Sequence, residues 1–144
     1  MNAKMLRDKR GYSTLFWATF FGLVLIPMLA LSIEVGRFFF SRSQIAAAAD
    51  AAALASAIEI NQRLFVETGQ LAPNSQTYAW AQKAANANSS ELLDKGVYPR
   101  VSNIVISGNT VKVAVSAQLE LLFPSIVPDV TVTEWGKAEV RALR

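Results

Sequence analysis

Residues 11–33 read GYSTLFWATFFGLVLIPMLALSI, an uncharged and largely apolar stretch between Lys9-Arg10 and Glu34. An α-helix rises about 1.5 Å per residue, so about twenty residues cross the hydrocarbon core of a bilayer. The stretch is long enough for this, and it lacks the polar face that a surface helix of a soluble domain carries. It therefore predicts a membrane-spanning helix.

Pro27 lies inside this predicted helix. Proline has no backbone N–H and crowds the preceding turn, so we expect a kink there, which a membrane helix tolerates when its neighbours satisfy the freed carbonyl. The simplest interpretation is a kinked anchor, and Pro27 is also a candidate for helix packing.

The 144-residue sequence has a formal net charge of +3, but its basic residues are concentrated before the apolar stretch. Those within the first ten positions are Lys4, Arg7, Lys9 and Arg10. Basic residues beside a first apolar segment hold that side in the cytoplasm. We therefore expect a cytoplasmic tail at residues 1–10, a transmembrane helix at residues 11–36, and an extracytoplasmic domain at residues 37–144.

The sequence contains no cysteine and no histidine, and its carboxylates are spread along the chain. It has no metal-ligand spacing and no Gly-rich loop between a strand and a helix. The external basic residues are interleaved with acidic ones, which argues against nucleic-acid binding. We expect a protein that is not an enzyme, with no catalytic residue, cofactor, metal or small-molecule substrate.

Two cleavage sites near the N-terminus stay open as alternatives. Residues 30–32, Ala-Leu-Ser, fit a signal-peptidase site near Ser32, although the apolar stretch is longer than most signal peptides. Cleavage there would release a secreted module that binds a glycan or a protein partner through its sheet. Arg10 followed by Gly11 resembles the leader of a type IV prepilin, cut between Gly11 and Tyr12, but the glutamate of such pilins is replaced by Phe16.

The stretch from Arg37 to Thr68 is rich in alanine and contains no glycine or proline, so we expect the helix to continue through it. One apolar stripe follows the helical spacing along this segment. Its members are Ala47, Ala51, Leu54, Ile58 and Phe65. Its small residues allow a neighbouring backbone, such as that of a second subunit, to approach closely. The alternative is that alanine only supplies helix propensity.

Three of the charged residues of this helix are candidates for a specific contact. Glu34 and Arg37 are three residues apart, so we expect them to pair, either as a partner contact or where the membrane ends. Asp50 has no basic residue three or four positions away. It either pairs with another chain or another part of the domain, or faces water.

The remaining sequence predicts a second helix and three strands. We expect the helix to start at a Ser75 cap, to weaken at residues 86–90 and to end at Gly96. Alternating residues predict strands at 101–107, 110–123 and 130–143, with a bulge near Trp135-Gly136. Only the helices are available to cover the inward face of this antiparallel sheet, which gives an α+β domain of pilin-like outline.

Residues 9–57 resemble the N-terminal region of the TadE/TadG-like proteins of the Flp (tight adherence) pilus system. The elements that carry the resemblance are Arg10-Gly11, Pro27, Glu34-Val35-Gly36-Arg37 and Asp50-Ala51-Ala52-Ala53-Leu54. The family often has aspartate where this chain has Glu34, which is a conservative change.

The resemblance implies a structural component of a Flp pilus or of its assembly and secretion apparatus, in the bacterial inner membrane and with its outer domain in the periplasm or on a surface filament. Its implied partners are the membrane, other pilus or Tad-apparatus subunits, and further copies of the chain. The candidate interaction residues are Pro27, Glu34, Gly36, Arg37, Asp50, Ala51 and Leu54.

Overall fold

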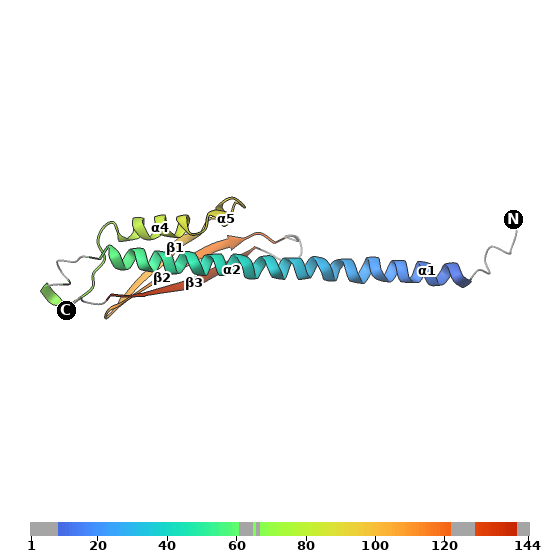
Figure 1. Ribbon diagram of the computed structural model, residues 1–144, viewed down its shortest axis with the longest axis horizontal. Coiled ribbons are helices and arrows are strands. Elements are labelled where there is room, and N and C mark those ends of the chain that lie inside the picture. Colours follow the sequence, from blue (N-terminus) through green and yellow to red (C-terminus); the bar gives the residue numbers. More distant parts are fainter. Residues whose placement is uncertain (1–8, 61–64, 66, 122–128, 141–144) are drawn as a thin grey trace. The chain divides into compact units, whose positions relative to one another are not determined.

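The computed structural model describes residues 9–60, 65, 67–121 and 129–140 (Figure 1). The chain divides into two compact units, Met1–Arg37 and Phe38–Arg144. The described part of the first unit is helical, and the second combines helices with a three-stranded antiparallel sheet. The α+β class and the long N-terminal apolar helix are therefore confirmed, while the assignment of the segments to membrane and compartments stays a prediction.

The first unit contains α1 (Lys9–Phe20), the π-helical segment η2 (Phe21–Leu25) and the beginning of α2 (Ile26–Ile58). The N–H of Ile26 bonds to the carbonyl of Phe21, five residues back. Pro27 has no N–H to offer to the preceding turn, and a widened turn is one way for a helix to accommodate that loss. The structure has a π-helical segment that ends two residues before Pro27, and the kink that we predicted at Pro27 stays a prediction.

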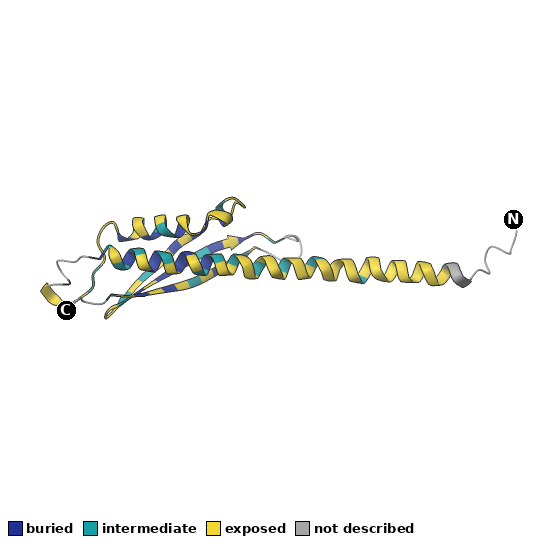
Figure 2. Ribbon diagram, in the orientation of Figure 1, coloured by how far each residue is buried: buried dark blue, intermediate teal, exposed yellow. Residues whose placement is uncertain are grey.

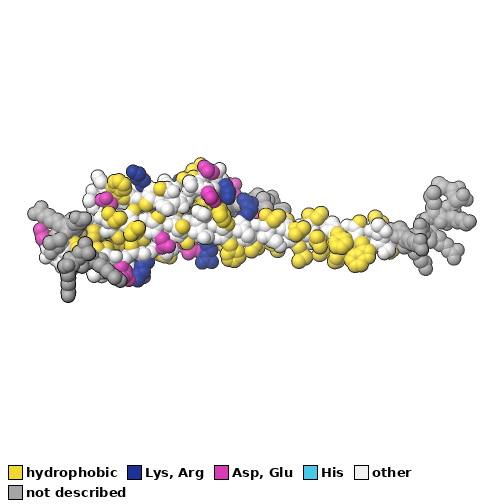
Figure 3. Space-filling view, viewed as in Figure 1, with side chains coloured by type: hydrophobic (Ala, Val, Ile, Leu, Met, Phe, Trp, Pro, Cys, Tyr) yellow, Lys and Arg dark blue, Asp and Glu magenta, His cyan; other side chains and the backbone are white. Residues whose placement is uncertain are grey.

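Two polar side chains within this apolar helix hydrogen-bond to the helix backbone. The Thr19 hydroxyl donates to the Leu15 carbonyl at 2.9 Å, and the Ser32 hydroxyl donates to the Met28 carbonyl at 2.8 Å. Such bonds remove the cost of placing a hydroxyl in an apolar medium. The helical stretch Tyr12–Ile58 reaches a mean hydropathy of 2.1 over 18 residues, none of them buried, and Figure 3 shows hydrophobic side chains covering its first part. These properties are compatible with membrane anchoring.

The second unit contains the rest of α2, then α4 (Thr77–Ala87), α5 (Ser90–Leu93), β1 (Arg100–Ser107), β2 (Thr110–Leu119) and β3 (Val130–Glu139). The sheet order is β1-β2-β3, and both strand pairs are antiparallel. Buried residues of α2, α4 and the inward sheet face form one hydrophobic core. The helices therefore cover one face of the sheet, as the sequence predicted.

The central strand β2 shows the predicted alternation. Its buried inward residues are Val111, Val113, Val115, Ala117 and Leu119. Lys112 and Gln118 are exposed on the opposite face, but Ala114 is buried there beside its cross-strand partner Trp135. The strand ends at Leu119, short of the predicted end at residue 123, which lies outside the described residues.

The expected bulge at Trp135-Gly136 is wrong. The β2–β3 register runs unbroken through both residues, and the irregularity lies in β1, between Val101 and Asn103. Gly136 instead marks a close approach, because a Cβ atom at this position would overlap the backbone carbonyl of Ala49 in α2. A glycine in a strand interior is often explained in this way.

The predicted continuous helix to Thr68 is also wrong, because α2 ends at Ile58. Ile60 forms an isolated antiparallel bridge with Pro73, and the Thr77 hydroxyl donates to the Glu59 carbonyl at 2.8 Å. These tertiary contacts draw the chain out of the helix although no glycine or proline ends it. Residues 61–64 and 66 lie outside the described residues.

Two expectations about the second helix have different outcomes. Ser75 is not its cap: Gln76 occupies the N-cap position, its side chain makes no capping hydrogen bond, and the Ser75 hydroxyl donates to the Asn74 side-chain oxygen at 3.1 Å. The expected weakness at residues 86–90 is confirmed, because α4 ends at Ala87 and α5 begins at Ser90.

Replacing Gly136 by alanine should destabilise the protein, because the new Cβ forces the backbones of β3 and α2 apart. Overpacking of this kind costs about 1–3 kcal/mol in the free energy of unfolding. The measurement is denaturant unfolding of the full-length protein in detergent. Gly36→Ala is the matched control, since a Cβ at position 36 meets no atom within 4 Å, and an equal loss in both variants would contradict the close approach.

Candidate functional site

Among residues 9–60, 65, 67–121 and 129–140, no group of three or more His, Cys, Asp or Glu side chains could hold a metal ion. The features that stand out are apolar surfaces. They lie on α2 and along the edge of the sheet.

In the second unit, α2 has two different faces (Figure 2). The buried face, which we call the inner row, consists of Ile45, Ala48, Ala49, Ala52, Ala53 and Ser56. The opposite face, which we call the outer stripe, consists of Ala47, Ala51, Leu54 and Ile58. Leu54 is 60% exposed and Ile58 is 63% exposed. Both sets recur every three to four residues, as the faces of a helix do.

The inner row explains most of the alanine content of this helix. Because alanine ends at Cβ, the α2 backbone can lie close to the sheet, and Gly136 removes the last obstruction on the strand side. A backbone does approach this helix closely, but it is that of the chain's own β3 and it lies against the inner row, whereas we expected the close approach at Ala47 and Ala51. Leu54 and Ile58 of the outer stripe are exposed, and the stripe remains the candidate surface for a second subunit.

Asp50 lies between these two faces and is exposed. Within the described part of the chain it makes no hydrogen bond and no ion pair. It therefore faces solvent in the isolated chain, and pairing with a residue of another chain stays a prediction. Ala51, next to it, is half-buried.

The remaining predicted site residues lie along the helix of the first unit and do not form one cluster. Arg37 and Glu34 pair at 3.5 Å, as their spacing predicted. Gly36 and Pro27 are exposed. Gly11 and Tyr12 both lie in α1, so the predicted prepilin cleavage would cut a helical peptide bond.

Charged contacts that sequence reasoning missed connect elements far apart in the chain. Arg42 of α2 donates to the Glu134 carboxylate of β3 at 2.5 Å, and the Lys95 ammonium lies 4.7 Å from the ring centre of Phe40. The two members of the ion pair are 92 residues apart. No local pattern could have identified this pair, and because Arg42 is well exposed it adds little stability.

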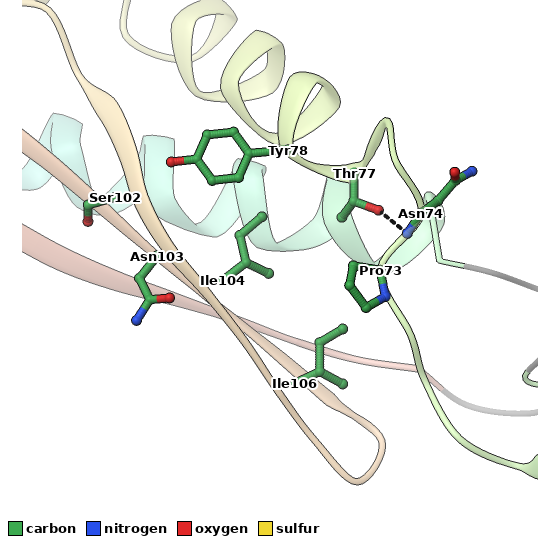
Figure 4. Close-up of a pocket in the computed structure, with 8 residues that line it drawn as sticks. All are labelled: Pro73, Asn74, Thr77, Tyr78, Ser102, Asn103, Ile104 and Ile106. Atoms are coloured by element: carbon green, nitrogen blue, oxygen red, sulfur yellow. Dashed lines mark hydrogen bonds between the residues drawn. The ribbon is translucent and has the colours of Figure 1, made fainter.

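A groove of about 410 Å³ lies between the start of α4 and the strand β1 (Figure 4). It is lined by Pro73, Asn74, Thr77, Tyr78, Ser102, Asn103, Ile104 and Ile106. Tyr78, expected within the apolar stripe of the second helix, is half-exposed, and its hydroxyl donates to the Val101 carbonyl. No local sequence pattern indicates this groove, because its walls come from separate elements.

Comparison with known families confirms the resemblance found in the sequence. The model of the family described as putative Flp pilus-assembly TadE/G-like matches residues 11–59. The match covers the apolar helix, the inner row and the outer stripe, and leaves the sheet outside. No curated protein and no solved structure matches the chain.

The two faces of α2 should respond differently to substitution. Ala52→Leu should lower the free energy of unfolding by about 1–3 kcal/mol, because Ala52 is fully buried against the core. Leu54→Ala should change it by less than about 0.5 kcal/mol, because the side chain is largely exposed. Denaturant unfolding of both full-length variants is the measurement, and a larger loss for Leu54→Ala would reverse our assignment of the faces.

Proposed function

We propose that this protein is a structural, non-enzymatic component of a Flp-type pilus or of the apparatus that assembles and secretes it. The observation that carries the proposal is the match of residues 11–59 to the TadE/G-like family. The exposed apolar helix of the first unit supports anchoring in the bacterial inner membrane by a single helix.

We propose that the N-terminus is cytoplasmic and that the second unit lies in the periplasm or outside the cell. The basic residues before the apolar stretch support this orientation. The Glu34–Arg37 pair lies where the apolar stretch ends, and pairing lowers the cost of placing two charges at the membrane surface.

In this proposal the outer stripe is the surface that contacts neighbouring subunits. Ala47 and Ala51 permit close approach, while Leu54 and Ile58 supply apolar area that is exposed in the single chain. The partners are other pilus or Tad-apparatus subunits, or further copies of this chain. In a pilin-like role the subunit would leave the membrane and enter a filament. This transfer is energetically feasible, because the apolar helix exchanges lipid contacts for similarly favourable contacts with neighbouring helices.

The state of the native N-terminus distinguishes the possible roles. We expect the protein in membranes and, if it is a fibre subunit, in sheared filaments; N-terminal sequencing and intact mass of each fraction are the measurements. A start at Met1 in membranes indicates a resident assembly factor, and a start at Tyr12 in filaments indicates a prepilin. A soluble chain starting at Ile33 would contradict anchoring and favour the secreted module.

A charge in the outer stripe should block assembly without unfolding the subunit. For Leu54→Asp, an unpaired carboxylate buried at a subunit contact costs about 2 kcal/mol or more, which corresponds to at least about a thirtyfold loss of assembled protein. Surface filaments and subunit levels in the membrane are measured in parallel. Asn86→Asp adds the same charge at an exposed position of α4, and equal loss in both variants would contradict a specific role of the stripe.

A further inference from the structure

The two edges of the sheet differ in charge. The edge strand β3 carries Glu134, Lys137 and Glu139, whereas β1 and its turn carry no charged residue from Val101 to Asn109. Proteins commonly place charges on an exposed edge strand to prevent pairing with another chain. By this criterion the β3 edge is protected and the β1 edge is not.

Side chains of α4 satisfy the backbone at the start of the β1 edge. The Val101 N–H donates to the Gln82 side-chain oxygen at 2.8 Å, and the Val101 carbonyl accepts from the Tyr78 hydroxyl. The Gln82 amide nitrogen also donates to the Pro99 carbonyl at 2.9 Å. These bonds replace the hydrogen bonds that a neighbouring strand would make, but only as far along β1 as Val101.

Farther along β1 the edge is open. The Gly108-Asn109 loop is a two-residue hairpin, so Ser107 and Thr110 form a hydrogen-bonded pair, and pair types then alternate along the ladder. This alternation directs the backbone N–H and C=O groups of Ile104 and Ile106 away from β2. In the described ranges of the chain, no group on that side hydrogen-bonds to them.

The groove follows this open edge. In Figure 4 the side chains of Ile104 and Ile106 lie on the side of β1 that faces Pro73 and Thr77. None of the residues that line the groove is charged. The matching occupant is therefore an uncharged extended strand with apolar side chains at alternating positions.

We propose that the occupant is β1 of a second copy of this chain, paired antiparallel about a two-fold axis at Val105. In this register Ile104 of each copy lies opposite Ile106 of the other, so the free backbone groups bond reciprocally and two three-stranded sheets become one. The strand has the chemistry that the groove requires, because it is uncharged from Val101 to Ser107 and places two isoleucines on the groove side. A two-fold contact needs such self-complementarity.

The absence of cysteine from the natural sequence permits a direct test by disulfide trapping. Val105 would face its own counterpart in a non-hydrogen-bonded pair, where Cα atoms are about 4.5 Å apart, which is within the range of about 4.4–6.8 Å that a disulfide requires. Mild oxidation of full-length Val105→Cys, in membranes and after purification in detergent, should shift the chain to a disulfide-linked dimer of twice its mass. Val105 is 40% exposed, so the substitution should preserve the fold.

Thr133→Cys is the matched control, because it is exposed on the β3 edge strand and should stay monomeric. The register has a test of its own: Asn103 of one copy lies opposite Ser107 of the other. A mixture of Asn103→Cys and Ser107→Cys proteins should cross-link, whereas each alone should not, because identical residues would be four positions apart, or about 13 Å.

A monomeric Val105→Cys protein after oxidation would overturn the proposal, as would equal cross-linking of Thr133→Cys or cross-linking of the mixture no greater than that of its components. Cross-linking of Val105→Cys in membranes to a different protein would also overturn it and would assign the groove to a strand of that protein. The readout requires only this chain and is therefore independent of its proposed role in a pilus.

Discussion

The second unit depends on the close contact between the α2 backbone and the sheet. Alanines of the inner row and Gly136 of β3 meet where no larger residue fits, since even one added Cβ at position 136 would overlap the helix backbone. This contact fixes the face of α2 that is buried. The outer stripe is exposed as a consequence, because residues offset by half a turn cannot reach the sheet.

The same close contact accounts for many of the alanines in α2. Two explanations were open, helix propensity or a packing face for another subunit, and the structure adds packing against the chain's own sheet. The inner row and the outer stripe occupy different faces of one helix, so internal packing and an external contact do not compete. The match to the TadE/G-like family covers both faces and ends just after α2.

Elements with local sequence signals could be predicted. Hydrophobic length identified the apolar helix, alternation identified the inward face of β2, and the Asn-rich segment marked the break after α4. Contacts between distant residues left no local signal: Ile60 with Pro73, Arg42 with Glu134, and Ala49 with Gly136. For that reason the predicted end of α2 and the predicted bulge at Gly136 were wrong, and the groove beside β1 was not predicted.

A core that relies on alanine has a further thermodynamic consequence. Each alanine buries little apolar area, so the inner row contributes less hydrophobic free energy than a row of leucines would. Alanine also has no side-chain rotamers to lose on folding, whereas leucine or methionine forfeits part of its conformational entropy. The helix–sheet contact therefore has little freedom to rearrange its side chains, and a misplaced atom there must be accommodated by movement of the backbone itself.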